Sequence, residues 1–190
     1  MKKQVQNVII ASVILALLIG VFFLVTSLPV EKKSDTSISE PSYSAEPFLK
    51  NFLNNISSVL IENTSGTFEI EVSTQGDNKT YNIANLESSK TASQSSLEMF
   101  INQLINISPT KTVETDATDL KKYGLEPENS KITVKFKDSP TKTFKLGNQA
   151  PLSIGTYLRL DNEKTVYLIS IPDAEIFSNS KDFYIEESKQ

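Results

Sequence analysis

One uncharged apolar run near the N-terminus constrains this chain more than any other feature. Residues 8–28 (VIIASVILALLIGVFFLVTSL) contain no charged side chain. As an α-helix the run would be about 31 Å long, which matches the ~30 Å hydrocarbon core of a bilayer. A buried core helix is the alternative, but the remainder of a 190-residue chain is too small to surround so apolar a helix. The run therefore predicts a transmembrane helix.

The flanking residues predict the orientation of this helix. Lys2 and Lys3 precede the run, and basic residues favour the cytoplasmic side of a membrane. Residues 1–7 are therefore expected in the cytoplasm, and the chain beyond residue 28 outside it. Val25-Thr26-Ser27 resembles a signal-peptide cleavage site, but the run exceeds the ~7–15 residues of a signal-peptide core. The prediction is an uncleaved, single-pass anchor in the cell membrane.

Composition divides the remaining chain into three parts. Residues 29–47 hold three prolines and five serines without periodicity, which predicts a flexible linker with a root-mean-square span of about 24 Å. Residues 48–185 carry periodic apolar patterns and are expected to form one extracytoplasmic domain. Residues 186–190 are a charged tail.

The residue types that are missing exclude several kinds of site. The chain has no His and no Cys, which removes Cys/His zinc sites, thiol nucleophiles and histidine general bases. Its net charge is −4 and Arg159 is its only arginine, whereas nucleic-acid-binding domains are usually basic and read bases with arginine. We therefore predict no catalytic residue, no cofactor, no metal site and no nucleic-acid partner.

The clearest helical pattern lies in the middle of the domain. Apolar residues recur at helical spacing from Leu97 to Ile105, which predicts one amphipathic helix with a single buried stripe. Ser93 is the expected N-cap, and Ser95 with Glu98 has the spacing of a capping box. A shorter helical pattern covers residues 48–56.

Alternating apolar residues predict an antiparallel sheet. Short connections join four such segments after the helix, as a meander requires; the segments are 132–137, 141–146, 156–161 and 165–170. Before the helix, a hairpin is expected from the segments 59–61 and 68–72, followed by a short strand around Tyr81 and Ile83. The fold class is therefore α+β: an antiparallel sheet of hairpins with one main amphipathic helix, preceded by the transmembrane helix.

The stretch DLKKYGLEPENSKITVKF, residues 119–136, contains a glycine and a proline that predict where a helical turn ends. Thr118 or Asp119 is expected to cap a single helical turn, Gly124 to end the turn in the left-handed conformation, and Pro127 to prevent its continuation. A further turn is expected at Gly147. The stretch is interpreted as a structural joint between a helical turn and the sheet.

Three residues form a candidate ligand or partner face. Tyr157 and Arg159 alternate with leucines and so share one face of their strand, and Tyr167 is expected beside them across a hairpin. An aromatic pair around the only arginine suits a sugar or a peptide. A solvent-exposed cross-strand cluster without a ligand explains the same pattern.

Hydrolysis of a glycan would need two carboxylates on either side of the scissile bond. The candidate pairs are Asp116 with Asp119, Asp173 with Glu175, and Glu186 with Glu187. Helix starts already explain Asp119 and Asp173, because carboxylates are stabilising there.

The order of these features resembles the bacterial domain of unknown function 4340. The residues that carry the resemblance span about residues 56–180 and are Val59-Leu60-Ile61, Phe68-Glu69-Ile70, Ala92-Ser93-Gln94, residues 119–127 (DLKKYGLEP), Lys145-Leu146-Gly147-Asn148, Thr156-Tyr157-Leu158-Arg159 and Val166-Tyr167-Leu168-Ile169. Relatives usually carry a tryptophan after the opening hairpin, where this chain has Tyr81.

The resemblance implies a fold and a setting but no reaction. Similar domains follow an N-terminal membrane anchor, and some occur in auxiliary proteins of gliding-motility-type ABC transporters. The expected function is a membrane-anchored, non-catalytic interaction module whose partners are subunits of a transporter or of the cell envelope. The alternatives are a cell-wall glycan-binding domain and, third, an envelope hydrolase.

Overall fold

The computed structural model of the protein describes residues 45–52, 55–76 and 78–186. The predicted anchor, residues 8–28, lies outside the described residues, as does most of the predicted linker. Within the described part of the chain, no helix is both long enough and apolar enough to cross a membrane.

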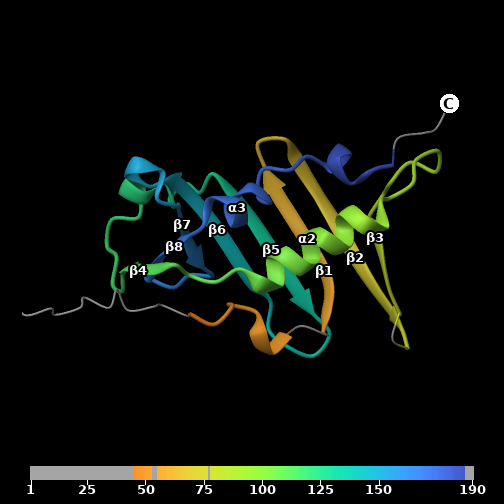
Figure 1. The fold of residues 1–190 in the computed structure, drawn as a ribbon, viewed down its shortest axis with the longest axis horizontal. Coiled ribbons are helices and arrows are strands. Elements are labelled where there is room, and N and C mark those ends of the chain that lie inside the picture. Colours follow the sequence, from red (N-terminus) through yellow and green to blue (C-terminus); the bar gives the residue numbers. More distant parts are fainter. Residues whose placement is uncertain (1–44, 53–54, 77, 187–190) are drawn as a thin grey trace, which may run out of the picture. The chain divides into compact units, whose positions relative to one another are not determined.

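A single antiparallel sheet of eight strands forms the centre of the domain (Figure 1). Its spatial order is β3-β2-β1-β5-β6-β7-β8-β4. The strands are β1 (Ile56–Asn63), β2 (Gly66–Gln75), β3 (Asn78–Ile83), β4 (Lys111–Glu114), β5 (Ser130–Phe136), β6 (Lys142–Gln149), β7 (Thr156–Leu160) and β8 (Val166–Ile169). The α+β class and the predicted strands are confirmed, and β1 pairs with the distant β5 to join the two hairpin groups.

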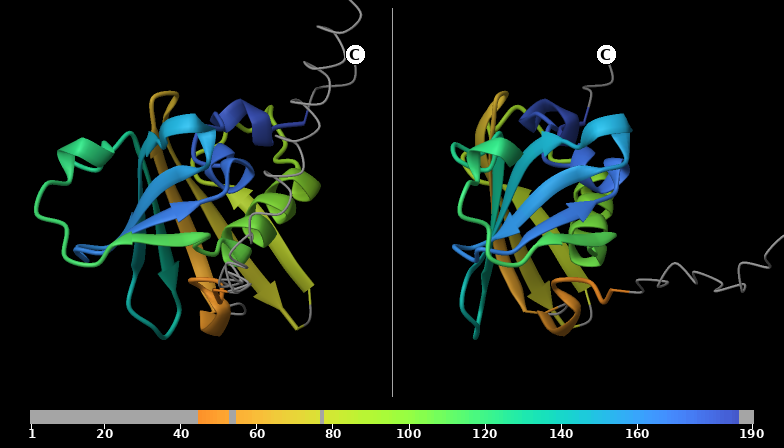
Figure 2. Two further views of the ribbon diagram at one scale, coloured as in Figure 1. Left: turned by 60° about the vertical axis from the view of Figure 1, so that its left-hand side comes forward. Right: turned by 90° about the vertical axis from the view of Figure 1, so that its left-hand side faces the viewer.

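One helix, α2 (Gln94–Asn106), lies across one face of this sheet (Figures 1 and 2). Its N-cap is Ser93, as predicted, because the Ser93 hydroxyl accepts a hydrogen bond from the backbone N–H of Ser96. The capping box predicted for Ser95 and Glu98 is wrong, since Ser95 is already inside the helix. The remaining helical elements are short: η1 (Lys50–Phe52), η2 (Lys121–Tyr123), η3 (Pro151–Ser153), α3 (Ile171–Glu175) and η4 (Lys181–Tyr184).

The N-terminal helical pattern is shorter than its spacing predicts. Only η1 forms there among the described residues, and Ile56 is the first residue of β1. Ile56 is paired with Phe136 in the sheet and is buried. Ile56 was expected at the end of a helix, but it belongs to a strand because it is paired with Phe136 in the sheet.

The main core lies between α2 and the sheet. Leu97, Phe100 and Leu104 of α2 are buried against the inward-facing residues of the central strands. The C-terminal segment closes this core, because the buried ring of Tyr184 packs between Phe68 and Phe100. Burial raises the pKa of Tyr184 to about 12, so its hydroxyl stays protonated at neutral pH.

A smaller cluster covers part of the opposite face. The connection from β4 to β5 folds over β7 and β8, so that Tyr123, Leu125 and Ala117 pack around Val166. Tyr123 donates a hydrogen bond from its hydroxyl to Glu114 (Oη to Oε2, 2.5 Å), and Lys122 forms a salt bridge with the same carboxylate at 2.9 Å. At its β7–β8 end, the sheet is therefore covered by packed apolar side chains on both faces.

The Tyr123–Glu114 contact predicts a pH-dependent stability. The hydrogen bond from Tyr123, and then that from Lys122, lowers the pKa of Glu114 below its ordinary 4.5. A carboxyl group whose pKa is lower in the folded state contributes stability above its unfolded pKa, and loses it as the pH falls through the folded value. Tyr123→Phe should therefore be less stable than the wild type at pH 7. Denaturant melts at stepwise lower pH should show that difference shrinking below about pH 4.3; a pH-independent difference would contradict the assignment.

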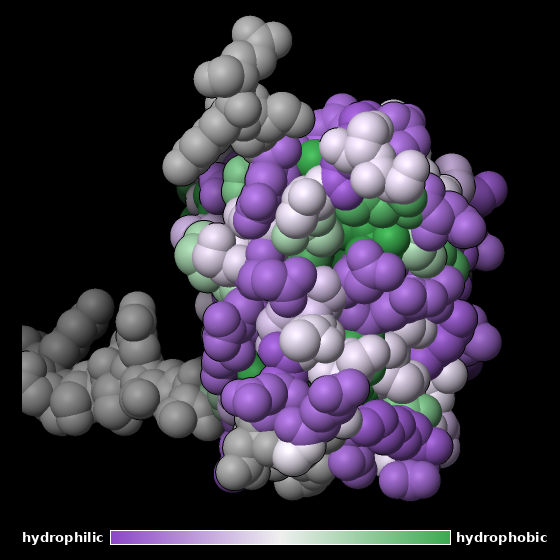
Figure 3. Space-filling view, turned by 90° about the vertical axis from the view of Figure 1, so that its right-hand side faces the viewer, coloured by the Kyte–Doolittle hydropathy of each residue, from purple (hydrophilic) through white to green (hydrophobic). Residues whose placement is uncertain are grey.

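Strand β3 is one edge of the sheet, and a side chain covers part of it. The amide of Gln94 accepts a hydrogen bond from the backbone N–H of Tyr81 at 2.9 Å and donates one to its carbonyl at 2.6 Å. These are the groups that an added strand would need, so Gln94 protects this position from edge-to-edge pairing. Seen from this side, the surface is mainly hydrophilic, with a hydrophobic area in its upper half (Figure 3).

Candidate functional site

The predicted face of Tyr157, Arg159 and Tyr167 is not assembled. In the β7–β8 hairpin, Leu158 is paired with Tyr167, and Tyr157 with Leu168. Paired residues point to the same face of a sheet, so Tyr167 lies on the face opposite to Tyr157 and Arg159. The prediction was wrong because a shift of one residue in register moves a side chain to the other face.

Both tyrosines are half-buried and pack against other aromatic rings instead. The Tyr167 ring contacts Phe48 at 5.1 Å between centroids, on the α2 side of the sheet. The Tyr157 ring contacts Tyr123 at 4.8 Å, within the smaller cluster on the other side. An aromatic sugar-binding platform formed by these two residues is therefore absent.

Two of the motifs that carry the family resemblance, residues 119–127 and 145–148, touch each other. Gly124 has φ 67° and ψ 26° at the end of η2, where a left-handed residue was expected. Gly147 is within β6, so the turn predicted there is wrong. A Cβ on Gly147 would collide with the carbonyl oxygen of Tyr123 and would lie 3.0 Å from Leu125 Cγ. Gly147 is thus required by close approach of another backbone segment rather than by a turn.

The rest of the joint fixes the start of β5. The cap predicted for Thr118 or Asp119 is wrong, because the N-cap of η2 is Leu120, which makes no side-chain cap bond. Asp119 instead accepts a hydrogen bond from the backbone N–H of Lys121 at 3.1 Å. The Glu126–Pro127 peptide bond is cis. Asn129 then donates to Asn148 Oδ1 at 3.1 Å, and its backbone N–H donates to the Leu146 carbonyl at 2.8 Å. These bonds bring the joint against the end of β6.

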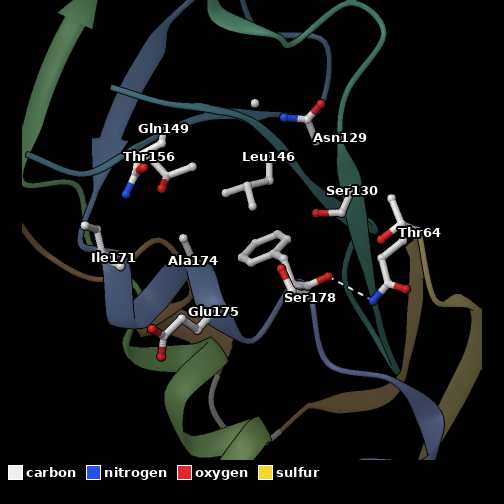
Figure 4. A pocket seen from close by; sticks show the side chains of 13 residues that line it. Thr64, Asn129, Ser130, Leu146, Gln149, Thr156, Ile171, Ala174, Glu175 and Ser178 are labelled. Carbon is white, nitrogen blue, oxygen red and sulfur yellow. Dashed lines mark hydrogen bonds between the residues drawn. The ribbon is translucent and has the colours of Figure 1, made fainter. Parts of the chain in front are cut away.

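A hollow of about 320 Å³ opens at this end of the sheet, at the small end of the range for ligand pockets. In Figure 4, Leu146 lies in the middle of the hollow, with Thr156 on one side and Ser130 on the other. The lining comes from the ends of β1, β5, β6 and β7 and from α3, and its residues are Asn63, Thr64, Asn129, Ser130, Leu146, Gly147, Gln149, Thr156, Ile171, Ala174, Glu175, Phe177 and Ser178.

Hydrogen bonds hold the walls of this hollow in place. The Asn63 amide at the end of β1 donates to the backbone carbonyls of Phe177 and Asn179, both at 2.9 Å. Ser170 caps α3 by accepting from the backbone N–H of Asp173 at 3.2 Å and donating to its carboxylate at 2.7 Å. The segment that follows α3 is therefore tied to the sheet across the hollow.

The chemistry of the lining suits binding of a neutral polar group. Amides and hydroxyls surround an apolar floor that includes the fully buried Phe177. Glu175 is the acidic residue of the lining, and its carboxylate lies at the margin of the hollow (Figure 4). Among the described residues, no group of three or more acidic side chains gathers as a metal site would require.

The carboxylates proposed for hydrolysis have other contacts. Asp116 forms a salt bridge with Lys164 at 3.1 Å, whereas Asp119 accepts from the backbone within the joint. Asp173 is the cap partner of Ser170. Glu187 lies outside the described residues, so the structure does not describe its pairing with Glu186.

The loop beside the hollow presents apolar side chains to solvent. It joins β6 to β7 over residues 150–155, and it leaves Leu152 94% exposed and Ile154 64% exposed. Leu152 and Ser153 have φ of 60° and 55°, a conformation that costs a non-glycine residue about 1–2 kcal/mol. Backbone bonds from Ala150 to Gly155 (2.8 Å) and from Ser153 to Ala150 (3.1 Å) hold the loop closed.

Sequence reasoning missed both the hollow and the loop. The lining residues, polar and apolar, come from separate segments, and no spacing along the chain connects them. The loop did carry a signal, since Leu152 and Ile154 are large apolar residues between Pro151 and Gly155.

Comparison with known proteins gives one match. The family model described as "Domain of unknown function (DUF4340)" matches residues 85–188, more than half of the chain. The match includes the joint, the Leu146-Gly147 motif and the β7–β8 hairpin, whereas the opening β1–β2 hairpin precedes it. No curated protein and no solved structure matches the chain. The matched region contains both motifs that meet at Gly147, and this chain belongs to the domain of unknown function 4340 family.

Proposed function

We infer that this chain is a membrane-anchored, extracytoplasmic and non-catalytic interaction module that binds a protein partner, as an accessory of an ABC-type transport or cell-envelope complex. The observation that carries this proposal is the 150–155 loop, which holds two large apolar side chains in solvent at a cost in backbone strain. Strain of this kind persists where the surrounding structure enforces it, and it is concentrated at functional sites.

The loop lies at the opposite end of the domain from the residues with which the described chain begins. The described chain begins beside η1, where Phe52 packs on Phe136 at the end of β5. The hollow and the loop lie at the Ser130 end of the same strand, about 20 Å away at ~3.3 Å per residue. The loop therefore lies away from the point at which the linker enters the domain.

Loss of the two apolar side chains should release the partner. We expect the Leu152→Ser/Ile154→Ser double variant of the full-length chain to recover at least about tenfold less partner after in-cell crosslinking and detergent extraction, because each buried apolar side chain contributes roughly 1.5–3 kcal/mol. Quantitative mass spectrometry of the extracts measures the loss.

The control is Met99→Ser/Phe183→Ser, which removes two other exposed apolar side chains, 65% and 56% exposed, in α2 and η4. It should leave recovery of the partner unchanged. Equal loss in both double variants would contradict a specific role for the loop. Retention on isolated cell-wall material that depends on Leu152 and Ile154 would favour the glycan-binding alternative instead.

A further inference from the structure

We propose that the sheet face opposite α2 carries a binding site for a phosphate group, formed around Lys145 and Arg159. This site is separate from the hollow and from the 150–155 loop, and the proposal does not depend on either. Among the described residues, Figure 2 draws no helix over β1, β2 and β5 on this face.

The strand register brings positive charges into one row. Lys131 of β5 is paired with Lys145 of β6, and Lys145 with Arg159 of β7. Residues paired across neighbouring strands have adjacent side chains, and like charges in such positions are destabilising. Glu62 of β1 continues the row opposite Lys131.

Two adjacent cations of this face, Lys145 and Arg159, have no carboxylate partner among the described residues. Three neighbouring lysines have acidic partners: Lys131 with Glu62 at 2.8 Å, Lys135 with Glu69 at 2.9 Å, and Lys142 with Asp161 at 3.3 Å. Lys145 and Arg159 form no salt bridge with the acidic residues that the structure describes. Two adjacent positive charges therefore remain uncompensated in a chain whose net charge is −4.

One nitrogen of the Arg159 side chain, Nε, also lacks a hydrogen-bond acceptor among the described residues. This nitrogen is buried. An unsatisfied buried donor costs about 1–3 kcal/mol. An oxyanion on this face would let the guanidinium turn outward and donate from two nitrogens, the bidentate geometry that arginine forms with phosphate.

A shallow hollow of about 270 Å³ is lined by Lys145 but not by Arg159, which is paired with Lys145 on the neighbouring strand. Two ammonium groups, two threonine hydroxyls and an amide line it, together with the carboxylate of Asp161; the residues are Lys131, Thr133, Thr143, Lys145, Asp161 and Asn162. Asp161 is already bonded to Lys142 and to the backbone N–H of Thr143 (2.8 Å). Lys131 is likewise paired with Glu62, so the Lys145 ammonium, the two threonine hydroxyls and the Asn162 amide are the groups that can donate to a phosphate oxygen.

The test uses the isotope-labelled full-length chain in neutral detergent micelles and follows the backbone NMR signals of β6 and β7. Inorganic phosphate is titrated against sodium chloride at matched ionic strength. In a second arm, the micelles are doped with phosphatidylglycerol or with phosphatidylcholine. Shifts around Lys145 and Arg159 with free phosphate would identify a soluble phosphate source, and shifts with phosphatidylglycerol alone would identify a lipid headgroup.

Lys145→Gln and Arg159→Gln should each weaken the response at least about tenfold, because each removes a charge-assisted hydrogen bond. Lys164→Gln, whose partner Asp116 lies elsewhere, is the matched control and should leave it unchanged. The proposal would be overturned by the absence of signal changes in both arms, or by equal weakening in Lys164→Gln.

Discussion

Replacing Gly147 by alanine is expected to lower the free energy of unfolding by about 3 kcal/mol, the upper part of the usual range for overpacking. The added Cβ would overlap the carbonyl oxygen of Tyr123 and would lie 3.0–3.1 Å from two carbon atoms of Leu125. The main obstacle is backbone, which cannot rotate away as a side chain can. Denaturant unfolding of the full-length chain in detergent, followed by circular dichroism, measures the loss.

Gly124 provides the comparison for this prediction. A Cβ there would meet the side chain of Asn148 instead of backbone, and the new residue would also have to adopt φ 67°. The Asn148→Ala change should therefore recover part of the stability lost in Gly124→Ala. Leu125→Ala should recover little of the loss in Gly147→Ala, because the Tyr123 carbonyl remains. Substantial recovery by Leu125→Ala would show that the contact with Tyr123 is not the limiting one.

Phe177→Ala should cost about 3–5 kcal/mol, as expected for a phenylalanine removed from a core. Phe177 is fully buried, its ring packs at 6.5 Å from that of Phe144, and it forms part of the floor of the hollow beside the 150–155 loop. At about 2–4 °C per kcal/mol for a domain of this size, the melting temperature should fall by roughly 10 °C. Thermal unfolding monitored by circular dichroism gives the shift.

Phe183→Ala is the matched control, since it removes the same side chain where 56% of it is exposed. Its melting temperature should change by no more than about 2 °C, in line with surface substitutions that usually stay within about 0.5 kcal/mol. If the two variants lose equal stability, Phe177 does not hold the hollow together as described. Partner recovery by the Phe177→Ala variant, measured below its melting temperature, tests separately whether the floor of the hollow also affects binding at the 150–155 loop.

Local patterns in the sequence are sufficient for most of the secondary structure. The stripe from Leu97 to Ile105 and the alternation in β5 to β8 identify the helix and the meander, because periods of 3.6 and 2 residues repeat along the chain itself. The left-handed Gly124 and the Ser93 cap are equally local. The capping box at Ser95 failed because two overlapping cap patterns compete, and only one can start the helix.

Contacts between distant segments needed the tertiary structure. The separation of Tyr157 from Tyr167 depends on which residues of β7 and β8 are paired, and the sequence pattern permits either register. Gly147 has a local pattern typical of a turn, but its role comes from a backbone segment more than twenty residues away.

The sequence by itself thus determined the fold class, the positions of the main helix and the strands, and the family motifs, since each depends on neighbours along the chain. Only the tertiary structure decided which side chains meet: the Asn63 tether to the segment after α3, the hollow around Leu146, and the row from Lys131 to Arg159. The physical reason is that strand pairing and packing select one register and one approach among several that the same periodicity allows.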